Sequence, residues 1–166
     1  TSSKRFPNKV IKKLFDKQLL YFLYLRLRES KLIKSIIVST SKLNADKKIE
    51  TICKKNKIIC FKGSHQNVLL RLYVTAKKFK LTSFVRISAD SPLMDSKIVD
   101  KGIKIFNKNK VDLVTNVFPR SYPKGQSVEI VKTSTLGKIL KEKLNKNNKE
   151  HVTKYIYDNP KKYKII

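Results

Sequence analysis

The sequence predicts an α/β fold, a Rossmann-like three-layer sandwich in which helices cover both faces of a mainly parallel sheet. Short apolar runs rich in β-branched residues alternate with amphipathic stretches of about ten residues or more, the pattern of βαβ units. A chain of 166 residues fits one domain, and a hydrophobic content of 40% is ordinary for a globular protein. We therefore expect a single domain over residues 1–166.

The predicted strands are short apolar runs, several of them closed by polar or glycine-containing turns. They are residues 35–40, 58–61, 84–87, 111–116 and 127–131. The predicted helices carry apolar residues at helical spacing on one face. They are residues 17–29, 46–55, 66–80, 96–107, 134–144 and 150–157. Prolines and polar residues predict loops over residues 1–13 and 118–125.

The formal net charge of +27 raises the question of a nucleic-acid partner. Only six of the 39 basic residues are Arg, and the lysines are scattered along most of the chain. Sequence-reading proteins use Arg for base contacts and aromatic residues for stacking. We interpret most lysines as a solvated surface and expect only non-specific, salt-sensitive binding to polyanions.

Two other features bear on where the protein works. No run approaches the roughly 18 apolar residues of a membrane span. Cys53 and Cys60 are too few and too far apart for a zinc site or a CxxC redox pair, and each falls on an apolar pattern. We expect both to be reduced core residues and the protein to be cytoplasmic.

One turn is a candidate site on its own chemistry. The apolar run Phe84–Ile87 ends in Ser88-Ala89-Asp90, a polar turn with one carboxylate at its tip. Ligands of open α/β sheets bind outside the carboxyl ends of the strands, so Asp90 is well placed to hold a metal ion. Capping of the next turn is the alternative, and from this stretch alone it is favoured.

Six short motifs, in order from residue 3 to residue 165, resemble those of nucleotidyltransferases that make CMP-activated sugars. Ser3 to Lys9 resembles their S-x-R-x-P-x-K signature. The other motifs are LFDKQLL (14–20), KGS with VLLR (62–71), VRISADSPLMD (85–95), YPKG with VE (122–129), and EHVT with a following Tyr (150–155). The similarity is strongest to the branch named for spore coat polysaccharide biosynthesis protein F, near the acylneuraminate cytidylyltransferases.

The resemblance implies the nucleotide-diphospho-sugar transferase type of fold and the transfer of CMP from CTP to an acidic or related sugar, with Mg²⁺ and release of pyrophosphate. It implies catalytic roles for Arg5, Lys9 and Asp90, with Asp90 as the metal ligand. Nucleotide contacts would come from Ser3, Arg5, Lys9, Ser64, Arg71 and Ala89. Sugar contacts would come from Arg86, Asn116, Tyr122, Gly125, Glu129 and His151, although His151 could equally be structural. Ser3, Arg5 and Lys9 alternate along one loop, which suits a triphosphate that needs cations and polar donors from one side.

Several positions depart from the family pattern. Ala89 replaces the usual Gly before the aspartate, Asn67 replaces an acidic residue, and Gln126-Ser127 replaces Leu-Asp. The last exchange removes a carboxylate from the expected sugar side, which leaves the sugar open, and a non-catalytic nucleotide- or sugar-binding relative is the alternative. We also expect the chain to lack the family's first strand and its C-terminal segment. Family members are often homodimers.

Overall fold

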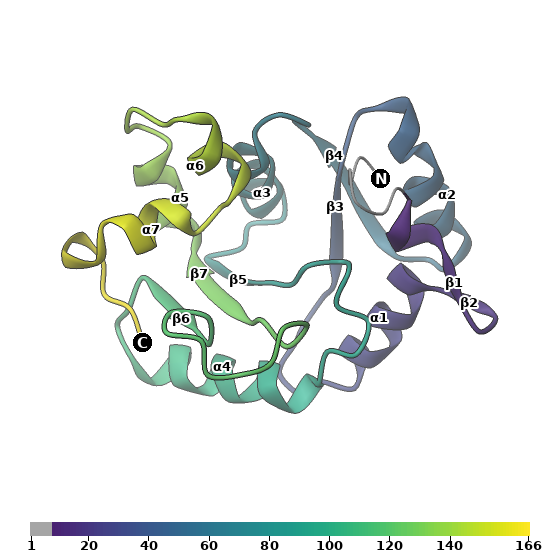
Figure 1. Ribbon diagram of the computed structural model, residues 1–166, viewed down its shortest axis with the longest axis horizontal. Helices are drawn as coiled ribbons and strands as arrows, with labels where there is room; N and C mark the ends of the chain where they lie inside the picture. Colours follow the sequence, from purple (N-terminus) through teal and green to yellow (C-terminus); the bar gives the residue numbers. More distant parts are fainter. Residues whose placement is uncertain (1–7) are drawn as a thin grey trace.

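In the computed structural model, which describes residues 8–166, helices lie on both sides of a layer of short strands (Figure 1). The strands are β1 (Lys13–Leu14), β2 (Lys17–Gln18), β3 (Ile37–Ser41), β4 (Ile59–Gly63), β5 (Ser83–Arg86), β6 (Leu113–Thr115) and β7 (Glu129–Lys132). The helices are α1 (Leu19–Arg28), α2 (Lys47–Lys55), α3 (Val68–Lys78), α4 (Ser96–Lys108), α5 (Thr133–Ile139), α6 (Lys146–Glu150) and α7 (Lys154–Asp158). Short 3-10 turns are η1 (Lys9–Ile11), η2 (Asn44–Asp46) and η3 (Pro160–Lys162).

The strands pair in both parallel and antiparallel directions, and the length of the connection between two strands accounts for the difference. β3 and β4 are parallel, with Ile37 opposite Ile59 and Ser41 opposite Gly63. β7 lies between β5 and β6 and is antiparallel to both, so β5 and β6 run in the same direction. β7 follows β6 through a loop without a helix, and a parallel pairing would need a longer crossover that is usually helical. Within residues 8–166 the expected parallel arrangement therefore has two exceptions, β7 and the short antiparallel hairpin of β1 and β2.

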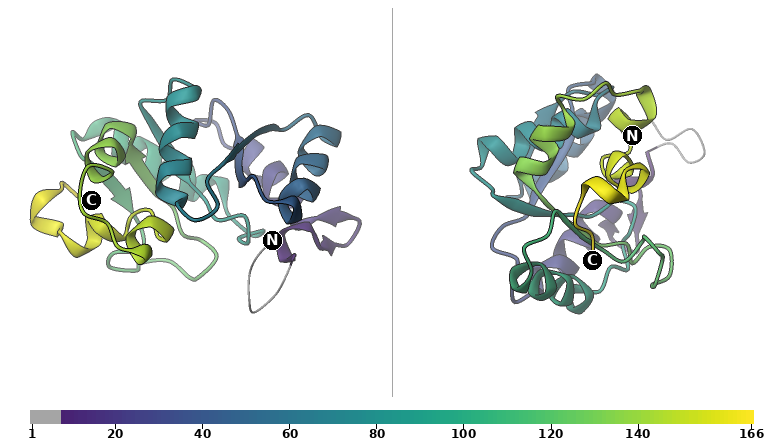
Figure 2. Two further views of the ribbon diagram at one scale, coloured as in Figure 1. Left: turned by 90° about the horizontal axis from the view of Figure 1, so that it is seen from above. Right: turned by 90° about the vertical axis from the view of Figure 1, so that its left-hand side faces the viewer.

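The two faces of the β5-β7-β6 sheet carry separate apolar clusters. Val114 and Ile130 pack in a cluster with α1 and α4, whereas Leu113 and Val131 pack in a cluster with α3, α5 and α7. Successive strand residues point to opposite faces, so adjacent positions serve different clusters. Figure 2 shows helices on both sides of the strands from two further directions. The expected three-layer sandwich is confirmed.

α3 connects the two sheets. Within residues 8–166 no strand pairing joins the β3-β4 pair to the β5-β7-β6 sheet. Thr75 of α3 shares a hydrogen bond of 2.9 Å with Ser39 of β3, while Leu69 of the same helix lies in the cluster that covers β6 and β7. A long amphipathic helix can serve both sheets in this way because its buried face extends along several turns.

The predicted elements are confirmed with shifted ends, and three differ more. The helix predicted over 134–144 ends at Ile139, η1 lies within the predicted N-terminal loop, and β1 begins at its last residue, Lys13. The helix predicted over 150–157 begins only at Lys154, as α7, and a separate helix that was not predicted, α6, ends before His151, whose backbone is extended. Thr153, the residue before α7, makes a tertiary contact, in which its hydroxyl group donates to the carboxylate of Glu129 at 2.6 Å.

Two expectations about thiols and membranes can be compared with the described residues. Cys53 is a buried free thiol and Cys60 a half-buried one, as expected of reduced core residues. Across residues 8–166 none of the helices has the length and apolar content that crossing a bilayer requires.

Leu69 and Leu70 offer a matched test of the packing around α3. Leu69 is fully buried, whereas its neighbour Leu70 is 38% exposed. Leu69→Ala should lower the free energy of unfolding by about 2–5 kcal/mol, because it removes buried methyl groups and leaves a cavity. Leu70→Ala should cost about 1 kcal/mol or less. Urea denaturation of both variants measures the difference, and equal losses would contradict the described orientation of the helix.

Candidate active site

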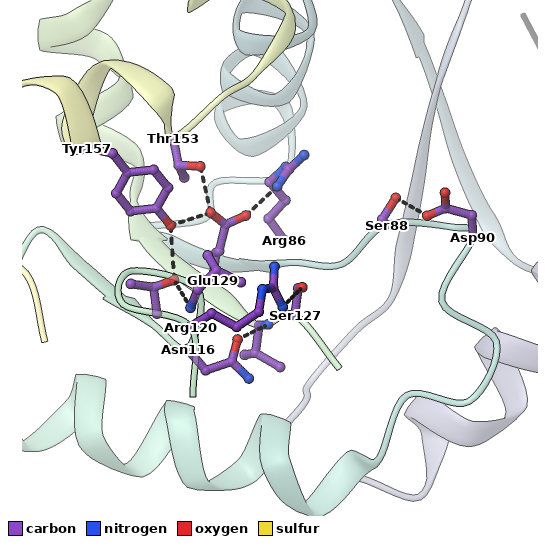
Figure 3. A network of polar contacts seen from close by, with 12 residues as sticks. Arg86, Ser88, Asp90, Asn116, Arg120, Ser127, Glu129, Thr153 and Tyr157 are labelled. Atoms are coloured by element: carbon purple, nitrogen blue, oxygen red, sulfur yellow. Dashed lines mark hydrogen bonds and ion pairs between the residues drawn. The ribbon is translucent and has the colours of Figure 1, made fainter. Parts of the chain in front are cut away.

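The turn after β5 brings together two residues that are 81 positions apart in the chain. Asp90 lies in this turn, which is closed by a hydrogen bond of 3.1 Å from the backbone N–H of Ser91 to the carbonyl oxygen of Ser88. The Nζ of Lys9, at the start of η1, forms an ion pair with the Asp90 carboxylate. The hydroxyl group of Ser88 donates to the same carboxylate (Figure 3).

These contacts keep Asp90 ionised. Burial by itself would raise the pKa of the Asp90 carboxyl group, but hydrogen bonds from Lys9 and Ser88 and the charge of Lys9 together lower that pKa below its ordinary value of 3.8. The cap of the following helix is a different residue, because the Asp95 side chain accepts from the backbone N–H of Lys97 at 2.8 Å. Asp90 is therefore a charged carboxylate at a strand end, with a cation beside it.

Ala89 fits the turn without backbone strain. Its φ is not positive, and its methyl group packs against the apolar cluster formed by α1, α2 and β4. A side chain at this position therefore costs little, and the usual Gly is not required here. Ser3 and Arg5, the other expected phosphate contacts, lie outside the described residues.

Ser64 and Arg71 meet where β4 leads into α3. The Nη1 of Arg71 donates to the carbonyl oxygen of Ser64 at 2.8 Å, and the Oγ of Ser64 accepts from the backbone N–H of Asn67 at 3.1 Å. Asn67 caps α3 by accepting from the N–H of Leu70 at 2.8 Å, so the amide performs the capping that an acidic residue would perform. A Cβ at Gly63 would lie 2.7 Å from the Cγ of Arg71, which explains a glycine at that position.

Arg71 is charged and incompletely paired. Its Nε is buried and has no hydrogen-bond partner among the described residues. Burial lowers the pKa of the guanidinium group, while the nearby carboxylate of Asp46 raises it. An arginine stays protonated under such conditions, so Arg71 is a cation with one unsatisfied donor.

The loop between β6 and β7 is held in place by two amide side chains. Asn116 donates to the carbonyl oxygen of Gln126 at 2.7 Å and accepts from the N–H of Val128 at 2.8 Å. Gln126 donates to the carbonyl oxygen of Leu93 at 2.7 Å and accepts from the N–H of Asp95 at 3.0 Å. Gln126, where the family pattern has Leu, thus joins this loop to the turn that carries Asp90.

Tyr122 and Gly125 lie in the same loop. The hydroxyl group of Tyr122 accepts from the Nζ of Lys101 at 3.4 Å, and Gly125 has a φ of +93° that favours glycine. Neither they nor Asn116 line the pocket described next. Their expected role in sugar binding stays a prediction.

A pocket of about 320 Å³ lies beside the end of β5. It is lined by Arg86, His151, Thr153, Lys154, Tyr157 and Asp158. Arg86 and His151 were expected at a sugar site, and the structure brings them together. The other four were missed, although Thr153 belongs to the EHVT motif and Tyr157 follows it by four residues, which is one helical turn.

Glu129 lies behind this pocket. The residue is 3% exposed, and its carboxylate accepts from Arg86, from the hydroxyl group of Thr153 at 2.6 Å and from that of Tyr157 at 2.6 Å (Figure 3). Burial, followed by the charge of Glu129, raises the pKa of Tyr157, so the phenol stays protonated and donates. Charge-assisted hydrogen bonds of this kind are about twice as strong as neutral ones.

The donor set decides which metal site is possible here. Across residues 8–166 no three His, Cys, Asp or Glu side chains gather as a metal site would require. A single ionised carboxylate, Asp90, suits Mg²⁺ that keeps several waters and gains its other ligands from substrate phosphates. The residues present therefore fit a metal that arrives with a nucleotide, and they do not form a cage made of protein ligands alone.

Comparison with known proteins points to one family. A sequence model described as cytidylyltransferase matches residues 1–166. An uncharacterized protein of Methanocaldococcus jannaschii is 36% identical over 166 residues, which is 100% of this chain and 67% of that protein. Spore coat polysaccharide biosynthesis protein SpsF of Bacillus subtilis is 28% identical over 98% of this chain and 69% of its own length.

A solved structure shares the fold closely. The structure of a cytidylyltransferase from Leptospira borgpetersenii superposes with a TM-score of 0.94 at 33% identity, over 98% of this chain and 69% of the other. A TM-score of this size means that nearly the whole path of the chain is shared. The nucleotide-diphospho-sugar transferase type of fold, expected from the motifs, is confirmed.

The lowered pKa of Asp90 predicts how the stability of the folded protein depends on pH. Because this pKa is lowered in the folded state, the ion pair stabilises the protein fully above pH 3.8, and the stabilisation is lost as the pH falls through the lowered value. Lys9→Met should raise the pKa of Asp90, which NMR titration of its carboxyl carbon measures. Lys13→Met removes the same charge from an exposed position and should leave the Asp90 pKa unchanged. A pKa of 3.8 or higher in the unsubstituted protein would contradict the ion pair.

Proposed function

Because the chain belongs to the cytidylyltransferase family, we propose that it transfers CMP from CTP to an acidic or related sugar and releases pyrophosphate. The observation that supports this most is the ion pair of Lys9 with Asp90. It brings a cation suited to a triphosphate next to a carboxylate suited to a metal, at the strand end where α/β sheets bind ligands.

The proposed reaction needs little covalent help from the protein. The sugar hydroxyl oxygen bonds to the α-phosphorus, the bond from that phosphorus to the oxygen bridging to the β-phosphate breaks, and the hydroxyl proton passes to solvent or a base. The rate then depends on alignment and on neutralising the charge that develops on phosphate oxygens. Mg²⁺, when held by Asp90 and the phosphates, supplies part of that neutralisation.

Each group of side chains has a part in this reaction. Lys9, released from Asp90 when the nucleotide binds, pairs with a phosphate group. Ser64 and Arg71 contact the nucleotide after the end of β4 and in the first turn of α3. Arg86 and His151 contact the sugar in the pocket beside β5. The loop that carries Gln126 keeps the Asp90 turn fixed while the two substrates meet.

The name of the Bacillus subtilis relative suggests a role in making surface polysaccharide. The free thiols Cys53 and Cys60 suit a reducing compartment such as the cytoplasm. A homodimer, which the resemblance to the family implies, stays a prediction for this chain.

The test is pyrophosphate release by the complete protein with Mg²⁺, CTP and a panel of acidic and neutral sugars, with ATP, GTP and UTP in parallel. Release should require CTP and a sugar. Asp90→Asn should lower kcat roughly 100-fold or more, since metal-assisted charge neutralisation contributes several kcal/mol. Asp16→Asn, at an exposed hairpin tip, makes the same chemical change and should leave the rate unaltered.

Other results would favour the alternatives. CTP binding without pyrophosphate release would indicate a non-catalytic nucleotide-binding relative. Strong salt-dependent binding to RNA or DNA that survives Asp90→Asn, without CTP binding, would indicate a polyanion-binding protein driven by the net charge of +27.

A further inference from the structure

Half of the side chains that line the pocket beside β5 are tied to one buried carboxylate. Of the six lining residues, Arg86, Thr153 and Tyr157 all donate to Glu129, which itself does not line the pocket. These donors come from β5, the residue before α7 and α7 itself, while Glu129 is the first residue of β7. Glu129 therefore fixes the pocket wall from behind (Figure 3).

Arg86 keeps donors for a ligand. Its side chain is 31% exposed, whereas that of Glu129 is 4% exposed. A guanidinium group has five N–H donors, and the ion pair with Glu129 engages Nη1. Arg86 also lies four residues before Asp90 on the same strand and turn, so a group held in the pocket is close to the expected reaction centre.

The rest of the wall is rigid for separate reasons. The ring of Phe118 stacks on that of Tyr157 at 4.8 Å between centroids, and the Tyr157 hydroxyl group shares a hydrogen bond of 3.0 Å with Thr115. Lys154 pairs with Asp158 at 2.8 Å through its single Nζ, whereas Arg86 has further N–H groups besides the Nη1 that pairs with Glu129. Arg86, fixed by Glu129, is then the cation best prepared to donate to oxygen atoms of a sugar.

We propose that Glu129 is a positioning residue for the acceptor sugar: it holds Arg86 in one orientation, and Arg86 donates to a carboxylate or hydroxyl oxygen of that sugar. This inference rests on the proposed cytidylyl transfer and adds a residue that selects the acceptor without touching it. Buried arginine–carboxylate pairs give geometric specificity because the planar guanidinium group accepts few orientations.

The test is a double-mutant cycle in the complete protein. Glu129→Gln keeps an oxygen that can accept from Thr153 and Tyr157 but removes the ion pair with Arg86. It should raise the KM for the sugar about tenfold, consistent with a lost charge-assisted hydrogen bond, and leave the Kd for CTP, measured by calorimetry, unchanged. Glu29→Gln, exposed at the end of α1, is the matched control and should change neither value.

The coupling between the two positions separates positioning from a merely structural role. If Glu129 acts through Arg86, the double variant Glu129→Gln/Arg86→Gln should lose no more sugar affinity than Arg86→Gln alone. Additive losses, or an equal loss of CTP affinity, would overturn the inference. Acidic sugars paired with their neutral analogues identify the contact, since only a carboxylate contact makes the effect larger for the acid.

Two further measurements separate a failure of this inference from a failure of the proposed function. If Glu129→Gln does not fold, Arg86→Gln alone must raise the sugar KM at constant CTP affinity, and a failure to do so overturns the inference. If the unsubstituted protein releases no pyrophosphate, the proposed function fails. Saturation-transfer NMR on the CTP-bound protein then tests the pocket: sugar binding lost in Glu129→Gln supports the inference, and no binding or unchanged binding overturns it.

Discussion

A buried carboxylate must be matched by hydrogen-bond donors, and the arrangement around Glu129 follows from that constraint. An ionised carboxylate at 3% exposure would be strongly destabilising without partners. Arg86, Thr153 and Tyr157 supply them and thereby bind β5, β7 and the C-terminal helices together. The same hydrogen bonds fix three of the side chains that line the pocket. Stability and the geometry of the candidate site therefore depend on one set of contacts.

The second charged pair is built differently. Lys9 and Asp90 have side chains about one-third exposed, so water screens their attraction and the pair contributes little to stability. Its importance is chemical. A cation and a carboxylate that are held together without a nucleotide can each take a new partner when triphosphate and metal arrive, at a small energetic cost. In the pair of Arg86 with Glu129 the carboxylate is buried, so Glu129 could not exchange partners in this way.

The sequence predicted the layers and most of the elements because apolar periodicity reports burial directly. It also predicted the turn at Asp90, since a polar segment with a proline, residues 88–92, follows an apolar run. Contacts between segments that are far apart along the chain could not be predicted from such local patterns. Nothing local marks Lys9 among so many lysines, and only the family motif singled it out. Gln126 and Tyr157 were missed because their partners, Leu93 and Glu129, lie some thirty residues away.

The most direct test of the central claim, that the carboxyl end of β5 is where nucleotide and sugar meet, is a crystal structure of the complete protein with CTP and Mn²⁺. Anomalous scattering locates the metal independently of the refined side chains. We expect Mn²⁺ between the Asp90 carboxylate and the phosphates, with the Nζ of Lys9 on a phosphate oxygen and Arg86 still paired with Glu129. Nucleotide and metal bound elsewhere, with the Lys9–Asp90 ion pair intact, would contradict the claim.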